Sequence, residues 1–122
     1  MSTLNVSNIT DGTDTVETGY VVNGSAKAWV GVLTSAAGIG DSLNVSSAVD
    51  DGTGLEEVIF TSSFDNNNYV TLGCLDRTTA GPTARIVTFY TKSVSSVHVA
   101  LYTVSQDASD QDKDVFFTGD LA

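Results

Sequence analysis

Apolar and polar residues alternate along most of the chain after residue 25. From Ala26 onward, every second residue is small or β-branched, and the residues between them are mixed. A period of two is typical of a β-strand. The small face predicts close approach to another sheet or to another chain, so we expect a subunit interface here. The expected interface residues are Ala26, Ala28, Trp29, Val30 and Val32.

The same alternation predicts further strands, separated by turns and polar loops. The expected strands span residues 26–33, 39–45, 57–61, 69–75, 85–91, 97–104 and 115–117. Residues 49–54 and 11–14 have turn composition, and residues 64–68, 76–83 and 105–114 read as loops. Seven to eight short strands at this spacing predict an all-β fold: a single antiparallel, jelly-roll-like β-sandwich over residues 26–122.

Residues 1–25 form a separate N-terminal arm in this interpretation. A few apolar residues punctuate a polar stretch and end in the run Tyr20-Val21-Val22. Alone they are too few to build a core. The arm is therefore expected to be either one edge strand with a turn, or a segment that lies on a neighbouring subunit or attaches to another protein.

Composition supports the β assignment and bounds the size. Val, Ile and Thr number 36 of 122 residues, whereas Glu, Lys, Arg and Gln together number 10. β-branched residues favour strands over helices. A chain of this length accommodates one domain.

Charge and special residues exclude several function classes. The net charge of −10 disfavours binding to nucleic acid or to an anionic membrane surface. The single Cys74 and single His98 cannot form a disulfide within the chain, a cysteine-rich zinc site or a histidine-pair metal motif. No signal peptide or membrane-spanning run is visible, so synthesis in the cytoplasm without a signal peptide and without membrane insertion is expected.

The candidate chemical sites are weak. Asp110, Asp112 and Asp114 have the spacing of the first calcium-loop ligands, but the rest of that pattern fails, so we expect a solvated loop and at most weak calcium binding. Glu56 and Glu57 are adjacent and should point to opposite faces of a strand. His98 is expected to be structural, and Cys74 to be a small core residue. We expect no catalytic activity and no cofactor.

Sugar binding is the one ligand chemistry that the residue types leave open. Aromatic rings stack on pyranoses and amides bind hydroxyls, so Asn66, Asn67, Asn68 and Tyr69 are the candidate ligand-binding residues. Trp29, Tyr90 and Tyr102 are further stacking candidates. The alternative is that these aromatic side chains fill the core of a small sandwich.

Several ordered blocks resemble the C-terminal domain of bacteriophage tail-fibre and related virion receptor-binding proteins, in particular those of marine and cyanobacterial phages. The blocks are Ser25-Ala26-Lys27-Ala28-Trp29-Val30, Ser42-Leu43-Asn44-Val45-Ser46-Ser47, Asp51-Gly52-Thr53-Gly54, Val58-Ile59-Phe60, Asp65-Asn66-Asn67-Asn68-Tyr69-Val70 and Asp114-Val115-Phe116-Phe117-Thr118-Gly119. They cover residues 20–120. Gly31-Val32-Leu33 departs from the family's usual continuation.

The resemblance implies a homotrimeric fibre or spike module of a virion that adsorbs to a host surface glycan or protein. It carries no catalytic residues over to this chain. The alternative is a decoration protein of the capsid or tail, such as a cement or head-fibre protein, with other virion proteins as partners and no host ligand. Both place the protein on the tail or capsid surface.

Overall fold

The computed structural model describes residues 2–33, 38–75, 85–103, 105, 107–108 and 110–122. It contains one short helix and ten strands. In chain order these are β1 (Asn8–Thr10), β2 (Thr15–Glu17), α1 (Thr18–Gly24), β3 (Ala28–Leu33), β4 (Gly38–Leu43), β5 (Val45–Gly52), β6 (Leu55–Phe60), β7 (Val70–Leu75), β8 (Arg85–Lys92), β9 (Ser96–Thr103) and β10 (Lys113–Thr118).

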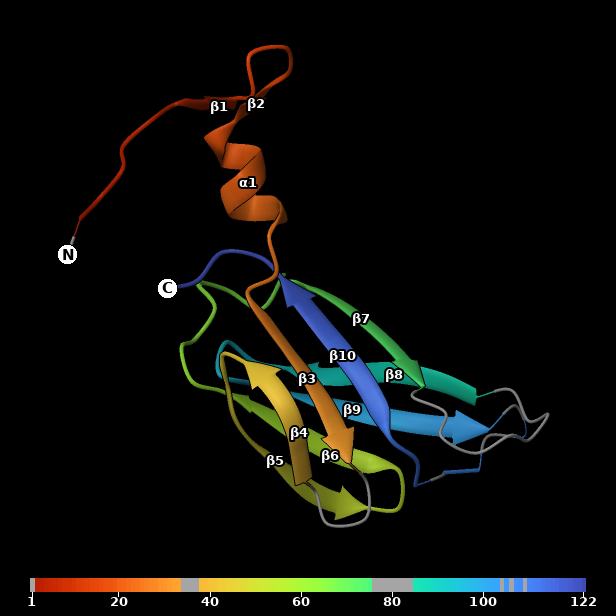
Figure 1. Ribbon diagram of the computed structural model, residues 1–122. Helices are drawn as coiled ribbons and strands as arrows, with labels where there is room; N and C mark the ends of the chain where they lie inside the picture. The colour runs from red at the N-terminus through yellow and green to blue at the C-terminus, as the bar shows by residue number, and fades with distance from the viewer. Residues whose placement is uncertain (1, 34–37, 76–84, 104, 106, 109) are drawn as a thin grey trace.

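Eight of the strands form two antiparallel sheets that pack face to face (Figure 1). The first sheet has the order β4-β3-β10-β7 and the second has the order β5-β6-β9-β8. This confirms the predicted all-β sandwich. A jelly roll also has eight strands in two sheets. Here three pairs of consecutive strands are hydrogen-bonded hairpins, β3–β4 in the first sheet and β5–β6 and β8–β9 in the second, and this gives a strand order different from that of a jelly roll.

The core lies between the two sheets and follows the alternation in the sequence. Every second residue of β3, β6 and β10 is buried, and β9 buries Val97 and then residues 99–101, because successive side chains of a strand point to opposite faces. At one end of the core, Phe60, Phe64, Tyr69 and Phe117 pack with ring centroids 4.3–6.1 Å apart. The sheets approach closely at Gly73 of β7, where an added Cβ would lie 2.6 Å from a methyl carbon of Val87.

Asn44 marks the corner at which the chain passes from the first sheet to the second. Its φ of 55° is left-handed, a conformation that asparagine tolerates better than most residues. Its side-chain amide donates to the Ser62 carbonyl at 3.0 Å, and its side-chain oxygen accepts from the Ser62 amide at 2.7 Å. The predicted continuous strand over residues 39–45 is therefore divided at this residue.

The strand β5 was not expected, because its second half has turn composition. The structure continues the strand to Gly52 and confines the turn to the residues between Gly52 and Leu55. Polar residues such as Asp50 and Asp51 are tolerated because β5 is an edge strand of its sheet. The expected loop over residues 76–83 lies outside the described residues.

The arm is a small hairpin followed by a helix, and both project from one end of the sandwich (Figure 1). The turn predicted at residues 11–14 connects β1 to β2, with Asp11 Oδ1 accepting from the amides of Thr13 and Asp14 at 2.9 Å. The edge strand expected at Tyr20–Val22 is wrong. These residues lie in α1, and the Ser25 amide after the helix donates to the Val21 carbonyl at 3.1 Å.

The base of the arm is tied to the sandwich by a few hydrogen bonds. Thr118 Oγ1 donates to the carbonyls of Asn23 and Ser25 at 2.9 and 3.0 Å. The helix itself buries no residue. In the described part of the chain, no helix has the length and apolarity needed to cross a membrane.

Candidate functional site

The outer face of the first sheet carries a continuous row of large apolar side chains. Leu43 of β4 pairs with Trp29 of β3, Trp29 pairs with Phe116 of β10, and Phe116 pairs with Leu72 of β7. Directly paired residues of antiparallel strands project from the same face. We call Leu43, Trp29, Phe116 and Leu72 the apolar row. Its members Trp29, Leu43 and Leu72 are 36–61% exposed.

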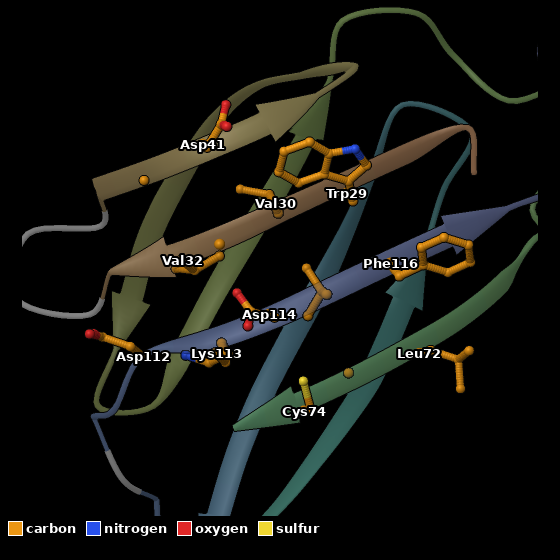
Figure 2. A pocket seen from close by; sticks show the side chains of 14 residues that line it. Trp29, Val30, Val32, Asp41, Leu72, Cys74, Asp112, Lys113, Asp114 and Phe116 are labelled. Carbon is orange, nitrogen blue, oxygen red and sulfur yellow. The ribbon is translucent and has the colours of Figure 1, made fainter. Parts of the chain in front are cut away.

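A shallow groove of about 610 Å³ runs beside the apolar row on the same face (Figure 2). Trp29, Phe116 and Leu72 line one part of it, and Asp41, Asp112 and Asp114 line another. Gly31 has no side chain to fill the groove, and a Cβ at this position would lie only 3.1 Å from Asp114 Oδ1. The groove therefore presents an apolar region next to a negatively charged one.

The predicted interface residues divide between the two faces of β3. Ala28, Val30 and Val32 are fully buried against the chain's own second sheet, so the expectation that they meet another subunit is corrected. Of the two readings of this small face, the structure supports close approach to another sheet. Ala26 is half-buried, before the strand begins. Trp29 alone of this set lies on the exposed face.

The predicted ligand-binding residues also separate. Tyr69 is only 3% exposed; its hydroxyl donates to the carbonyls of Ser93 and Ser96 at 3.0 and 3.2 Å, and burial raises its pKa to about 12. Tyr69 is therefore a core residue, and its predicted contact with a sugar is wrong. Asn66–Asn68 are exposed and lie in an Asx-type turn in which Asn66 Oδ1 accepts from the Asn68 amide.

The loop that carries Asn66–Asn68 lies at the same end of the sandwich as the arm and the C-terminus (Figure 1). Phe64 pairs with Leu121, and the Asp65 amide donates to the Asp120 carbonyl at 2.8 Å. This placement puts the loop next to the base of the arm. The turn between β5 and β6 lies at the opposite end of the sandwich.

Cys74 does not occupy the core as expected. It is exposed on the outer face of β7, opposite Asp114 in the pairing with β10. The predicted alternation is present in β7, but its direction is the reverse of the one expected for Cys74: Val70, Leu72 and Cys74 face outward, and the opposite face of β7, with Gly73, packs on the second sheet. A period of two does not say which face is buried.

The three aspartates with calcium-loop spacing are not brought together. Asp110 accepts a hydrogen bond from the Gly54 amide across the sandwich, Asp112 precedes β10, and Asp114 lies within β10 on the outer face. Among the described residues, the one group of three ligand-bearing side chains whose ligand atoms all lie within 4.8 Å of one another is Asp51, Glu57 and His98.

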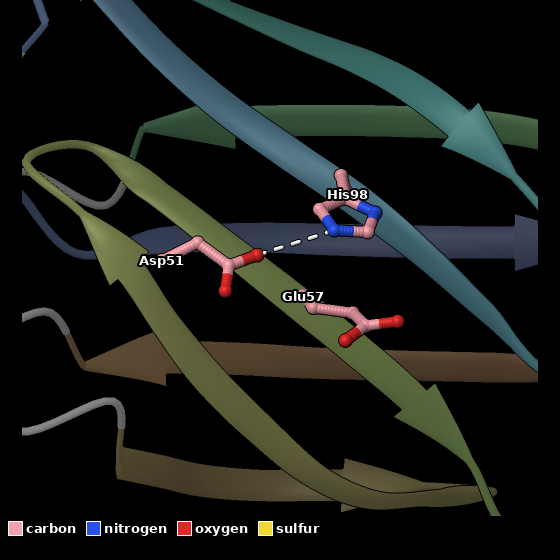
Figure 3. A group of neighbouring side chains, drawn as sticks. All are labelled: Asp51, Glu57 and His98. Carbon is pink, nitrogen blue, oxygen red and sulfur yellow. Dashed lines mark ion pairs between the residues drawn. The ribbon is translucent and has the colours of Figure 1, made fainter.

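This group lies on the outer face of the second sheet (Figure 3). Glu57 of β6 pairs directly with His98 of β9, and His98 pairs with Tyr90 of β8. His98 Nε2 is 3.2 Å from Asp51 Oδ2, and the rings of His98 and Tyr90 have centroids 5.2 Å apart. Partial burial, followed by the negative charge of Asp51, raises the pKa of Tyr90.

Glu56 points to the opposite face from Glu57, as predicted, and enters the core. Its carboxylate accepts a hydrogen bond from Lys113 Nζ, and the two side chains are 5% and 0% exposed. Burial raises the pKa of Glu56, and the ammonium of Lys113 opposes that shift without cancelling it. The ion pair joins β6 of the second sheet to β10 of the first. The sequence contains a signal for the burial of Lys113, since Lys113 lies two residues before Val115 and four before Phe117, on the same inward-facing side of the strand.

Comparison with known proteins adds no relative: no family model, no curated protein and no solved structure matches this chain.

Proposed function

We propose that this protein is a structural module of a bacteriophage particle, a homotrimeric tail-fibre or spike subunit that takes part in adsorption to the host. Two lines support the proposal. The ordered sequence blocks resemble the C-terminal domain of tail-fibre and related virion proteins. The β-sandwich supplies the rigid, loop-bearing scaffold that such a module needs.

The observation that carries the proposal is the apolar row. Large apolar side chains from four adjacent strands stand side by side on an outer face, and contiguous exposed apolar surface of this kind marks sites of protein association. A second copy of the chain is the occupant we propose. In a trimer the apolar row of each copy would face a common three-fold axis and contact both neighbouring copies there, which closes the assembly.

The arm gives the proposed subunit an attachment segment. Its apolar side chains Leu4, Tyr20 and Val22 are 57–82% exposed, and α1 buries no residue. A segment with no core of its own gains stability by packing on another surface. In this arrangement the Asn66–Asn68 loop belongs to the attached end, and the opposite end, with the β5–β6 turn, faces the host.

A capsid or tail decoration protein is the second candidate, favoured by the same exposed arm. A subunit that lies on a lattice of other virion proteins would use the arm to contact its neighbours and would need no host ligand. The two candidates differ in copy number and position: a fibre or spike is present in a few copies at the tail, whereas a decoration protein is spread over the particle.

Light scattering coupled to size-exclusion chromatography tests the assembly. At low micromolar concentration we expect three times the chain mass of 12.7 kDa. Leu72→Ser, in the apolar row, should dissociate the trimer, whereas Ile86→Ser should not, because Ile86 is similarly exposed but lies in β8 of the second sheet. A monomeric wild-type protein would overturn the proposed trimer.

Antibody labelling of phage particles tests the location. A fibre or spike predicts label at the tail and inhibition of adsorption by the purified protein. Label spread over the capsid would replace this function with the decoration role, and the absence of label from particles would refute both.

A further inference from the structure

The cluster of Asp51, Glu57 and His98 is assembled by strand register together with a β-bulge. Glu57 and His98 are directly paired, so their side chains project from the same face. On β5 the register shifts between Asp50 and Gly52, which makes Asp51 the extra residue of a bulge. A bulge changes the direction in which a side chain projects, and at this bulge the Asp51 carboxylate contacts His98 Nε2.

The separation of two of the ligand atoms matches that of two ligands on one metal ion. The three ligand atoms all lie within 4.8 Å of one another, and the contact between His98 Nε2 and Asp51 Oδ2 is 3.2 Å. Two ligand atoms that are each about 2.0–2.1 Å from a tetrahedral Zn²⁺ lie about 3.3 Å apart. We propose that Asp51, Glu57 and His98 bind a divalent transition-metal ion, with Zn²⁺ as the best fit.

Charge favours a cation at this position. The two carboxylates lie close together, and their charges would be balanced by one divalent ion. In the part of the chain that the structure describes, the lysines and arginines all contact groups elsewhere: Lys27 contacts Ser25, Arg85 contacts Gln111, Lys92 contacts Tyr69, and Lys113 contacts Glu56. The net charge of −10 further attracts cations to the surface.

The imidazole selects the class of metal. Calcium and magnesium take oxygen ligands, whereas an imidazole nitrogen with carboxylates suits Zn²⁺ and its first-row neighbours. His98 Nε2 is the ring nitrogen that contacts the cluster, at 3.2 Å from Asp51 Oδ2; when Nε2 ligates the ion the ring proton is on Nδ1, which is buried with no hydrogen-bond partner among the described residues. Packing on Tyr90 holds the ring in place.

The proposed site remains open to solvent on one side. The Asp51 side chain is 36% exposed and that of His98 is 24% exposed. With three ligands from the protein, a tetrahedral ion retains one position for water or for a ligand from another molecule. This site is independent of the apolar row, which lies on the other sheet, and its test does not depend on the oligomeric state.

Isothermal titration calorimetry with ZnCl₂ at pH 7.5 tests the proposal on the full chain. We expect one Zn²⁺ per chain and no comparable heat with CaCl₂. Asp51→Asn, Glu57→Gln and His98→Asn should each weaken binding by at least about tenfold. The matched controls Asp14→Asn and Glu17→Gln remove the same charges from the arm and should bind as the wild type does.

A stability measurement keeps the test valid if a variant folds poorly. Zn²⁺ should raise the thermal midpoint of the wild type and of both controls, since a ligand of the native state stabilises it, and should leave Glu57→Gln unchanged. Equal affinity in His98→Asn and wild type, or several weak ions per chain with no loss in any cluster variant, would overturn the proposal. Either result would mean that scattered carboxylates bind the metal and that the 3.2 Å contact is a simple ion pair.

Discussion

Replacing Lys113 by methionine tests the most buried polar contact in the sandwich. The change keeps a long, unbranched side chain but removes the ammonium that the Glu56 carboxylate contacts. Both side chains are at most 5% exposed, so Glu56 would be left as an unpaired charge between the sheets. Breaking a buried pair by removing one partner costs about 3–5 kcal/mol, a large share of the roughly 5–15 kcal/mol by which a domain is stable.

The pH dependence of this loss has a defined sign. Burial raises the pKa of Glu56 above its usual 4.5, and the contact with Lys113 is the main influence that lowers it. In Lys113→Met the pKa rises further. A carboxyl whose pKa is raised on folding favours the folded state below its unfolded pKa and loses that contribution as the pH rises through the folded pKa. The variant should therefore recover part of its stability between pH 7 and pH 5.

Urea unfolding followed by the fluorescence of Trp29, the single tryptophan, measures both effects. The double variant Glu56→Leu/Lys113→Met should be far more stable than either single variant, because no buried charge remains. Lys27→Met, at a half-buried lysine at the base of the arm, is the control and should cost less than about 1 kcal/mol. A loss below about 1 kcal/mol in Lys113→Met, or a loss that is equal at both pH values, would refute the buried pair.

Three further predictions follow from the packing. Gly73→Ala should destabilise the fold by about 1–3 kcal/mol in urea unfolding, since its Cβ meets Val87 at 2.6 Å; an unchanged midpoint would contradict the close approach of the sheets. Tyr69→Phe should cost about 0.5–1.5 kcal/mol through the lost hydrogen bonds to two carbonyls, measured in the same way, and a stabilised variant would argue against them. The Cys74 thiol lies on the face of the apolar row and is exposed in the single chain, so Ellman's reagent should modify one thiol per chain promptly in the dissociated Leu72→Ser variant and slowly in the trimer. Equal rates in both proteins would show that no other copy covers this face.

The strand pattern was readable from the sequence because alternation is a local property. Val97, Val99 and Leu101 repeat at every second position, and the structure buries them all. The opposite directions of Glu56 and Glu57 followed from the same rule. Where the local signal was ambiguous, the edge-strand alternative was wrong: the run Tyr20–Val22 has strand-forming residues but lies in helix α1, because β propensity depends on context and is a weak guide for a short run.

The candidate sites could not be predicted in the same way, since they depend on register between distant strands. Leu43, Trp29, Phe116 and Leu72 come from four strands and become neighbours only through pairing. Likewise Asp51 and His98 are far apart in sequence, and a bulge in β5 brings them together. No spacing in the sequence encodes either contact.

The sequence by itself determined that this chain is an all-β domain with an acidic surface and a distinct N-terminal arm. Composition and alternation act on each residue and its near neighbours, and these suffice to specify strands and turns. Only the tertiary structure decided which face of each strand is buried. Ala28 and Tyr69, which were candidate contact residues, are buried in the core, whereas Trp29 and Cys74 are exposed on the outer face. The reason is that burial depends on which face of a strand packs against the other sheet.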